Sequence, residues 1–544
     1  MKIIYKLSVF ALGCVTVVAC SDMDDITSEG NRITEEQVNE TTSSVPERVE
    51  ASLAGIYSYA GQQYCCFPSS ERDDDFGYPG VCLSQDLNGP DMVADNVGFN
   101  WFSVSSEYSD RNANYANPYM RYANTYNQIK LANDLLLSVD PASTDKTIQQ
   151  YIAQAKAVRA FGYLCLTPYY QFNYSANKDK PCVPLVTEET TDFANNPRAT
   201  VEAVYEQIMK DLNEAIGLLE GYDRGTDKTR IDQQVAYGLR ARANLYMGNW
   251  ADAVADAEKA MQGYTPYTLA EVSVPAFVNL KDHNWMWGIQ IEAANITGNG
   301  GLPTWPSKLS SFTGAGYTTG AGCYKYINKL LFDKIPESDI RKSWWVDEKL
   351  HSANLANVSW DGVTGDAISS LTIPDVKEPY TPYTNIKFGM KSGIGSTTND
   401  CDWCLMRVEE MILIKAEALA QQGKGSEAAT ALKALMSQRD ASWNASSVSV
   451  DDVWFQRRVE LWGEGFSMAD IMRLNKPVVR FHEGKTDNWP DAFRFNIEAN
   501  DGYLLLRFPQ KETNNNAGIP ATENNEGKQP AAGQNGNLRD GVTD

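Results

Sequence analysis

A spacing of small residues that recurs at two distant places in the chain constrains the fold more than any other feature. In the first copy the positions are Ala241, Leu245, Gly248, Ala253, Ala257 and Ala260, and the same intervals separate Ala416, Ala420, Gly423, Ala428, Leu432 and Leu435. A glycine that ends one helix, with an alanine five residues later where the next helix approaches, is typical of an antiparallel helix pair. Such pairs bury their apolar faces only by stacking. The spacing therefore predicts a mainly α fold built on a tetratricopeptide-like scaffold of helical pairs.

Helical periodicity extends this scaffold over much of the 544-residue chain. Apolar residues recur at helical intervals in segments 46–60, 117–138, 147–170, 200–220, 232–247, 250–262, 404–422, 425–439, 451–463 and 466–474. Two irregular stretches, 61–116 and 264–400, are rich in turn residues and aromatics, and we expect the binding surface where these two stretches meet the scaffold. The predicted organisation is a single domain over 34–544. Its parts are a helical scaffold at about 34–263 and 401–510, a variable loop and short-strand insertion at about 264–400, and a loop-rich tail at 511–544.

The first 20 residues have the pattern of a bacterial export signal. Lys2 and Lys6 precede an apolar run that ends in Ala19 and Cys20, and this run is too short to span a membrane. A small residue followed by cysteine resembles a lipobox, which predicts a signal peptide at 1–19 and lipidation of Cys20. Residues 20–33 would then form a flexible tether. The alternative is an ordinary secretory signal in which Cys20 has no role.

The charge and the cysteine content exclude some classes of function. With 70 acidic and 48 basic residues the net charge is -22, which argues against nucleic acid as a partner. Cys401 and Cys404 form a single CxxC without a nearby histidine, so a local disulfide or two free thiols fits better than a zinc or redox site. Adjacent Cys65 and Cys66 are expected to pair elsewhere rather than with each other. No cofactor or metal is predicted; the alternative is calcium at Asp73–Asp75, where the usual ligand spacing is absent.

The acidic residues near the end of the scaffold do not predict an enzyme. Glu460 and Glu464 are four residues apart, a spacing that can pair two carboxylates on one helical face. Neighbouring arginines would keep both ionised, and glycoside hydrolysis needs a proton donor. We therefore expect a buried ion network between helices.

Several motifs occur in an order that identifies a family resemblance. They are Ile129–Asn133, Ala155–Tyr163 (A-x-x-x-R-A-x-x-Y), Pro181–Leu185, Arg230–Trp250, Met406–Ala418, and Arg458–Gly465 followed by Asp470 and Arg473. Together they resemble the SusD/RagB family of nutrient-binding outer-membrane lipoproteins of the Bacteroidetes. The resemblance implies a non-catalytic protein, anchored in the outer membrane by its lipid and facing the cell exterior. It also implies an oligosaccharide or polysaccharide ligand and a SusC-like TonB-dependent transporter as partner. A peptide ligand and, less in keeping with the residues, a lipoprotein glycoside hydrolase are the alternatives.

Sugar rings are bound by exposed aromatic faces beside polar groups, so the candidate ligand residues are aromatics in loops. The predicted set is Trp101, Asn100, Tyr78, Trp285, Trp305 and Trp344. Trp101 and Asn100 rank first, because the resemblance implies that binding aromatics come from this region. For each tryptophan the alternative is a role in the core. Trp250, Trp287, Trp454 and Trp462 are expected to be buried.

Overall fold

The computed structural model describes residues 46–296 and 298–544. The predicted signal peptide, the lipidated Cys20 and the tether lie outside the described residues. The predicted fold class is confirmed: helices form the body of the molecule and the sheets are small. Among the described residues, none of the helices is both long enough and apolar enough to cross a membrane.

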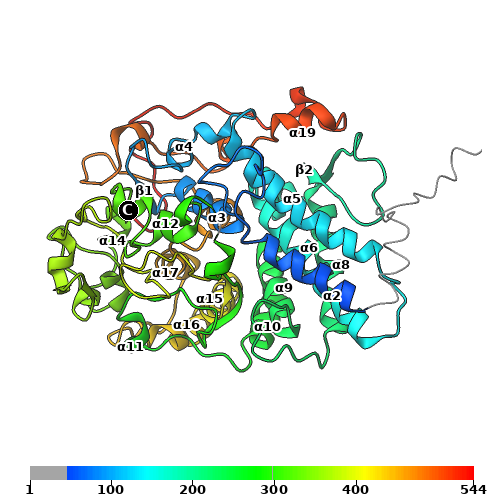
Figure 1. Ribbon diagram of the computed structural model, residues 1–544, viewed down its shortest axis with the longest axis horizontal. Coiled ribbons are helices and arrows are strands. Elements are labelled where there is room, and N and C mark those ends of the chain that lie inside the picture. Colours follow the sequence, from blue (N-terminus) through cyan, green and yellow to red (C-terminus); the bar gives the residue numbers. More distant parts are fainter. Residues whose placement is uncertain (1–45, 297) are drawn as a thin grey trace, which may run out of the picture.

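The N-terminal half is a layer of long helices (Figure 1). These are α2 (Pro46–Tyr59), α5 (Ala116–Leu137), α6 (Lys146–Tyr170) and α8 (Val201–Leu218). Each of the last two begins at a side-chain cap: Asp145 accepts hydrogen bonds from the backbone of Thr147 and Ile148, and Thr200 accepts one from Ala203. Helix α6 packs between α5 and α8, so its residues from Ala157 onward are almost all buried. This layer lies on the side of the molecule away from the insertion.

Both copies of the repeated spacing form helix pairs, as predicted. The first pair is α9 (Gln233–Met247) with α10 (Trp250–Ala260), and the second is α15 (Val408–Gln421) with α16 (Gly425–Met436). Gly248 and Gly423 end the first helix of each pair in the left-handed region, with φ of 83° and 75°, where glycine has no steric penalty. Helix α10 packs against α15. The array is therefore continuous in space although the insertion separates its two halves in the sequence.

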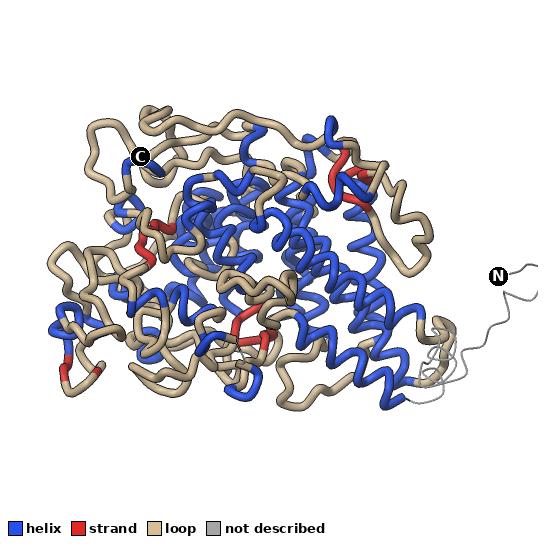
Figure 2. Tube along the Cα trace, turned by 45° about the horizontal axis from the view of Figure 1, so that its top comes forward, coloured by secondary structure: helices blue, strands red, loops and turns tan. Residues whose placement is uncertain are grey.

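The late scaffold helices are α17 (Val450–Glu460) and α18 (Ser467–Arg473), close to their predicted ranges. One boundary prediction was wrong: residues 404–407 belong to strand β8 (Trp403–Arg407), which pairs antiparallel with β4 (Trp285–Ile289). The other short elements are α7 (Tyr174–Asn177), β2 (Pro181–Pro184), β3 (Arg198–Thr200), α11 (Leu269–Val272), α12 (Trp305–Leu309), α13 (Tyr317–Gly320), β5 (Lys325–Ile327), α14 (Lys329–Phe332), β6 (Ser359–Trp360), β7 (Val363–Thr364) and α19 (Gln510–Asn515). Figure 2 shows how much of the left side of the molecule is loop.

Sequence periodicity missed two helices in the stretch 61–116, the longer α3 (Tyr78–Asn88) and the short α4 (Ser103–Glu107). Helix α3 begins with Tyr-Pro-Gly, which is typical of a turn, and every residue after Tyr78 is buried. A helix that is buried on all sides has no polar face, so it lacks the amphipathic period by which helices are recognised. Strand β1 (Met92–Ala94) follows directly and pairs antiparallel with β5 of the insertion.

A buried ion network joins the insertion to the scaffold helices. Glu460, at the end of α17, accepts hydrogen bonds from Arg407 at 2.8 Å and from Arg439 at 2.9 and 3.0 Å. Arg341 of the insertion contacts it at 3.3 Å and pairs with Asp339 at 2.6 Å. The four carboxylates and four cations of the network are Asp339, Glu409, Glu460 and Glu464, with Arg341, Lys387, Arg407 and Arg439. The charges balance, which is the condition for keeping so many ionised groups away from water.

The tail packs back on the body of the molecule. It runs from α19 along the upper edge in Figure 1 to a C-terminus beside β1 and α14. Asp540 is buried and forms an ion pair with Arg458 of α17 at 2.8 Å.

Lys325 in β5 gives the fold a pH dependence that can be measured. Its side chain is buried, and burial lowers the pKa of Lys325 to about 8 from the ordinary value of 10.5. Between these values the unfolded chain holds the proton more tightly, so this group makes stability rise with pH. We expect Lys325→Met to be more stable than the parent at pH 7, and this advantage to shrink by about 2 kcal/mol at pH 9.5. Urea unfolding at both pH values measures the difference in stability between variant and parent. Lys180→Met, at an exposed lysine, is the control. A difference that does not change with pH would contradict the lowered pKa.

Candidate aromatic binding site

A single turn carries the most exposed aromatic ring of the irregular stretches. After β1 the chain enters the loop 95–102, where the Asn100 N–H donates to the carbonyl of Val97 at 2.9 Å and closes a turn around Gly98 and Phe99. Phe99 at the tip is 63% exposed and Val97 is 42% exposed. The loop is anchored by Asp95, whose carboxylate accepts a hydrogen bond from Tyr326 of β5 at 2.7 Å.

Strand pairing brings an aromatic of the insertion to the same place. Tyr317 begins α13, just before β5, and β5 pairs with β1. The rings of Phe99 and Tyr317 are nearly parallel, with an interplanar angle of 22° and centroids 6.2 Å apart. Trp101 meets Tyr317 edge to face at 6.3 Å. We call Phe99, Trp101 and Tyr317 the aromatic platform. The two irregular stretches therefore meet here.

Charged groups support the platform. Lys308 of α12 is 2% exposed, and its Nζ lies 3.7 Å from the centre of the Tyr317 ring and 5.4 Å from that of Trp101. Burial lowers the pKa of Lys308 well below its ordinary value, although Asp73 and Asp74 oppose the shift. The Tyr317 hydroxyl donates to Asp73 at 2.6 Å, and burial together with this bond raises the pKa of Tyr317 to about 12. Tyr317 therefore stays neutral and fixed in place at physiological pH.

Arg72 completes the polar surroundings of Trp101. Its guanidinium lies 5.6 Å from the centre of the Trp101 ring and is held by a two-pronged hydrogen bond to Asp74, 2.9 Å on each side. Trp101 and Arg72 are both half-buried. The arrangement offers apolar ring faces beside charged and polar groups, which is the chemistry that binds sugar rings and their hydroxyls.

Of the predicted ligand residues, Trp101 lies in the platform, while Asn100 and Tyr78 do not. Asn100 is 4% exposed, and its side chain donates to the carbonyl of Asp95 at 2.9 Å, so it holds the loop from inside. Tyr78 packs edge to face on Phe161 at 5.1 Å, and its hydroxyl lies 3.2 Å from Cys165 Sγ. Placing these two side chains on the binding surface was therefore wrong, because both are turned into the body of the protein.

The prediction that Trp285, Trp305 and Trp344 present faces to a ligand was also wrong. All three are at most 2% exposed. Trp285 lies in β4, Trp344 donates to the carbonyl of Val272 at 3.0 Å, and Trp305 donates to that of Cys401 at 2.8 Å. Loop position did not mean exposure, because the insertion has a dense aromatic core. Trp305 reaches only the floor of a hollow of about 320 Å³ between the end of α2 and residues 290–305.

The tryptophans expected in the core are largely there. Trp287, Trp454 and Trp462 are at most 3% exposed, which confirms their predicted burial. Trp250 at the start of α10 is half-buried and packs against the edge of the core.

The paired carboxylates lie in a buried ion network, as predicted, but the cations around them are not the neighbouring arginines of the sequence. Burial alone would raise the pKa of Glu460, but Arg439 and Arg407 outweigh it and hold the pKa well below its usual range. For Glu464 burial is likewise outweighed, by Arg407 and Lys387, so its pKa is lowered. Neither group holds a proton to donate, so this pair lacks the general acid of glycoside hydrolysis.

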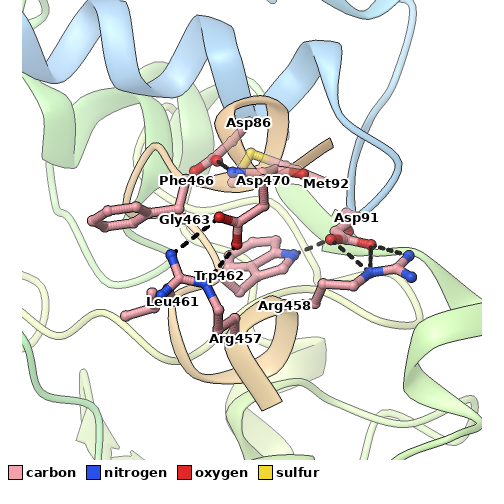
Figure 3. A pocket seen from close by; sticks show the side chains of 11 residues that line it. Asp86, Asp91, Met92, Arg457, Arg458, Leu461, Trp462, Gly463, Phe466 and Asp470 are labelled. Carbon is pink, nitrogen blue, oxygen red and sulfur yellow. Dashed lines mark hydrogen bonds and ion pairs between the residues drawn. The ribbon is translucent and has the colours of Figure 1, made fainter. Parts of the chain in front are cut away.

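The late signature around α17 has no room for a ligand. Arg457 points to Asp470 at 2.8 Å, and Arg458 to Asp91 at 2.7 Å (Figure 3). The cavity between them measures about 10 Å³, space for one water molecule at most. These charges therefore hold the helices α17 and α18 to the segment around β1.

The acidic run Asp73–Asp75 does not gather around one point. Asp73 binds Tyr317, Asp74 binds Arg72, and Asp75 accepts hydrogen bonds from the backbone of Cys66 and Phe67. Calcium at this run was the alternative to no metal. The three carboxylates bind different partners, which does not favour a calcium site. Within the described ranges the cysteines are free thiols, including Cys401 and Cys404. Cys65 and Cys66 are also free thiols, with their Sγ atoms 3.8 Å apart, so the structure shows neither the expected pairing elsewhere nor a bond between the two.

Sequence reasoning missed Phe99, Tyr317, Lys308 and Arg72. Phe99 lies two residues before Trp101, and its position after Gly98 in a turn was a usable signal. Tyr317 lies in a glycine-rich segment, 313–322, where an aromatic is unlikely to be packed by neighbours in the sequence. No sequence pattern marked Lys308, because only the tertiary fold places its Nζ beside the rings of Tyr317 and Trp101.

Comparison with known proteins agrees with this architecture. A family model described as starch-binding associating with outer membrane matches residues 83–245, and one described as the SusD family matches residues 304–537. No curated protein matches the chain. A solved SusD-like carbohydrate-binding protein from Bacteroides vulgatus is 24% identical, with a TM-score of 0.70 over 88% of this chain and 98% of that one.

Two further solved structures share the fold at lower identity. A laminarin-binding SusD-like protein is 20% identical, with a TM-score of 0.62 over 89% of this chain and 99% of that one. Surface glycan-binding protein A from Bacteroides uniformis is 16% identical, with a TM-score of 0.61 over 88% and 99%. These likenesses concern the fold, whereas the two family models match separate parts of the sequence itself. From the sequence motifs, the fold and these matches together, the chain belongs to the SusD/RagB family.

Proposed function

We propose that this protein binds oligosaccharide or polysaccharide at the cell surface, with the aromatic platform as its contact site. The observation that carries the proposal is the pair of nearly parallel rings of Phe99 and Tyr317 beside Trp101, with Phe99 63% exposed. A sugar ring has an apolar face that stacks on such a surface, while its hydroxyls reach the neighbouring charged groups.

The proposal extends to location and to a transport partner. We infer that Cys20 carries the lipid anchor, that the protein faces the outside of the outer membrane, and that it passes its ligand to a SusC-like TonB-dependent transporter. The support is the family match, whose first model is described as associating with the outer membrane, and the export pattern of residues 1–20. Co-purification of a barrel protein with the tagged lipoprotein from outer membranes tests it, with Cys20→Ala as the variant expected to lose membrane attachment.

We infer a role in binding rather than catalysis. The pair Glu460 and Glu464, which the sequence marked as the candidate carboxylates, is fully ionised in a closed network. A peptide ligand remains the second candidate, because an exposed aromatic platform also suits apolar side chains.

A panel of polysaccharides tests the proposed function. We expect the purified protein to be retarded in affinity gels that contain at least one neutral or acidic glycan, and calorimetry to give a modest affinity without release of reducing ends. Released reducing ends would point to the hydrolase. Failure to bind any glycan, together with binding of peptides, would overturn the proposal in favour of the second candidate.

A further inference from the structure

Cys65 and Cys66 lie side by side against the carboxylate of Asp75, in the loop between α2 and α3. Their Sγ atoms are 3.8 Å apart, and Cys65 Sγ is 3.3 Å from Asp75 Oδ1. One ligand atom from each of these three residues lies within 4.8 Å of the other two. Cys66 and Asp75 are buried, while half-buried Cys65 leaves the cluster within reach of solvent.

The separations match those around a tetrahedral ion. Zinc binds a thiolate sulfur at about 2.3 Å and a carboxylate oxygen at about 2.1 Å. With tetrahedral angles these lengths place two sulfurs about 3.8 Å apart, and a sulfur and an oxygen about 3.6 Å apart. The Cys65–Cys66 sulfur separation and the distance from Cys65 Sγ to Asp75 Oδ1 agree with these values to within about 0.3 Å. The third separation, from Cys66 Sγ to the Asp75 carboxylate, is within 4.8 Å. A disulfide, by contrast, would need the two sulfurs at about 2.05 Å.

The carboxylate is already oriented for this role. Asp75 Oδ2 accepts hydrogen bonds from the N–H groups of Cys66 at 2.8 Å and Phe67 at 2.9 Å. These two bonds leave Oδ1 directed at the thiol of Cys65. The loop itself is closed by the Tyr64 N–H, which donates to the Asp75 carbonyl at 2.7 Å. An ion would therefore find its oxygen ligand in place, held by the hydrogen bonds that a ligating carboxylate needs.

A fourth ligand is also at hand. The Asn124 side chain, on α5, lies with its Nδ2 3.3 Å from Cys65 Sγ. The oxygen and nitrogen of a carboxamide exchange places by rotation about one bond, so the same side chain can offer its oxygen. Asn124 is buried, and this holds it close to the sulfur.

We propose that Cys65, Cys66 and Asp75 bind one thiophilic divalent cation of the zinc class, with Asn124 or water as the fourth ligand. On binding, each thiol releases its proton to solvent as its metal–sulfur bond forms. Two thiolates and one carboxylate around the ion then leave a net charge of -1. The step needs no oxidant.

An ion at this place would brace the candidate glycan site. Cys65 and Asp75 stand at the two ends of a loop, and between them lie Arg72 and Asp73. Arg72 contacts the Trp101 ring, and Asp73 holds the Tyr317 hydroxyl. Joining the ends of the loop limits the movement of both groups. The metal site does not depend on the identity of the ligand, so its test is separate from that of the proposed function.

Titration with cobalt and zinc tests the proposal. The full chain is purified in detergent with a reductant, stripped with a chelator and titrated with Co²⁺, whose thiolate charge-transfer absorption reports sulfur ligation. We expect one equivalent to bind and Zn²⁺ to displace it. Cys65→Ser and Cys66→Ser should each weaken binding by at least about 100-fold, since even outer-shell partners are worth 10–100-fold. Asp75→Asn should weaken it as well.

Cys182→Ser is the matched control, because Cys182 is a buried free thiol in β2, apart from the cluster. Its variant should bind the ion as the parent does, and circular dichroism should show that each variant is folded. All the cysteine variants keep a side chain of similar size. Asn124→Ala is a separate check, on the fourth ligand of the site. No stoichiometric absorption in the reduced, folded parent would overturn the proposal. So would binding that survives in both Cys65→Ser and Cys66→Ser, or a Cys65–Cys66 disulfide that persists under reductant.

Discussion

Replacing Glu460 with alanine is expected to lower the free energy of unfolding by about 3–5 kcal/mol. Glu460 is fully buried, and its two oxygens are shared among the guanidinium groups of Arg341, Arg407 and Arg439. Without it three buried cations lose a common counter-charge. Removing one partner of a buried pair costs far more than the pair contributes, because the remaining charge is left without water or compensation. Urea unfolding followed by circular dichroism measures the loss.

Two further variants separate charge from packing. Glu460→Gln keeps the volume and removes the charge, so it should lose nearly as much stability as alanine. Glu220→Ala replaces an exposed glutamate and should stay within about 0.5 kcal/mol of the parent. The lowered pKa of Glu460 means that its contribution is complete above the ordinary pKa of 4.5 and is lost only as the pH falls through the lowered value. Parental stability in Glu460→Gln would show that the network is not important for folding.

Removing a ring from the aromatic platform is expected to reduce glycan affinity by about tenfold or more. Fully covering a side chain the size of Phe removes its apolar surface from water and is worth about 1.5–3 kcal/mol, and about 1.4 kcal/mol corresponds to tenfold in affinity. Phe99→Ala and Trp101→Ala should each show this loss, and the double variant should lose detectable binding. Tyr317→Phe keeps the ring but removes the bond to Asp73, so its loss should be smaller. Calorimetry with the glycan selected from the panel measures all four.

Phe193 provides the matched control for this series. It is 60% exposed, almost as much as Phe99, but lies in the loop between β2 and β3. Phe193→Ala should leave affinity unchanged, because an exposed ring without neighbouring aromatics and charges does not make a site. If Phe99→Ala and Trp101→Ala bind as the parent does while the protein still binds glycan, the platform is not the contact site.

The scaffold was readable from the sequence where helices are amphipathic. Helices α10 and α16 follow their predicted ranges closely, because each shows one face to the core and one to solvent. Helix α3 was missed for the opposite reason, since it is surrounded by protein. The predicted exposure of the loop tryptophans failed for a related reason. Residue type and turn neighbours do not tell whether the rest of the chain will cover a side chain, and Trp305 and Trp344 are covered by the aromatic core of the insertion.

The sequence by itself determined the family, the helical pairs and one member of the platform, Trp101. The family and the helical pairs follow from motifs, local periods and spacing. The cations that keep Glu460 and Glu464 ionised lie far from them along the chain and are placed by the tertiary structure: Arg341, Lys387, Arg407 and Arg439. Only the tertiary structure decided that α10 packs on α15 across the insertion, and that Tyr317 meets Phe99. It also brought Asp75 to the pair Cys65 and Cys66. The physical reason is that binding surfaces are made by residues far apart in the chain, and their meeting depends on the packing of the whole fold, which no local pattern records.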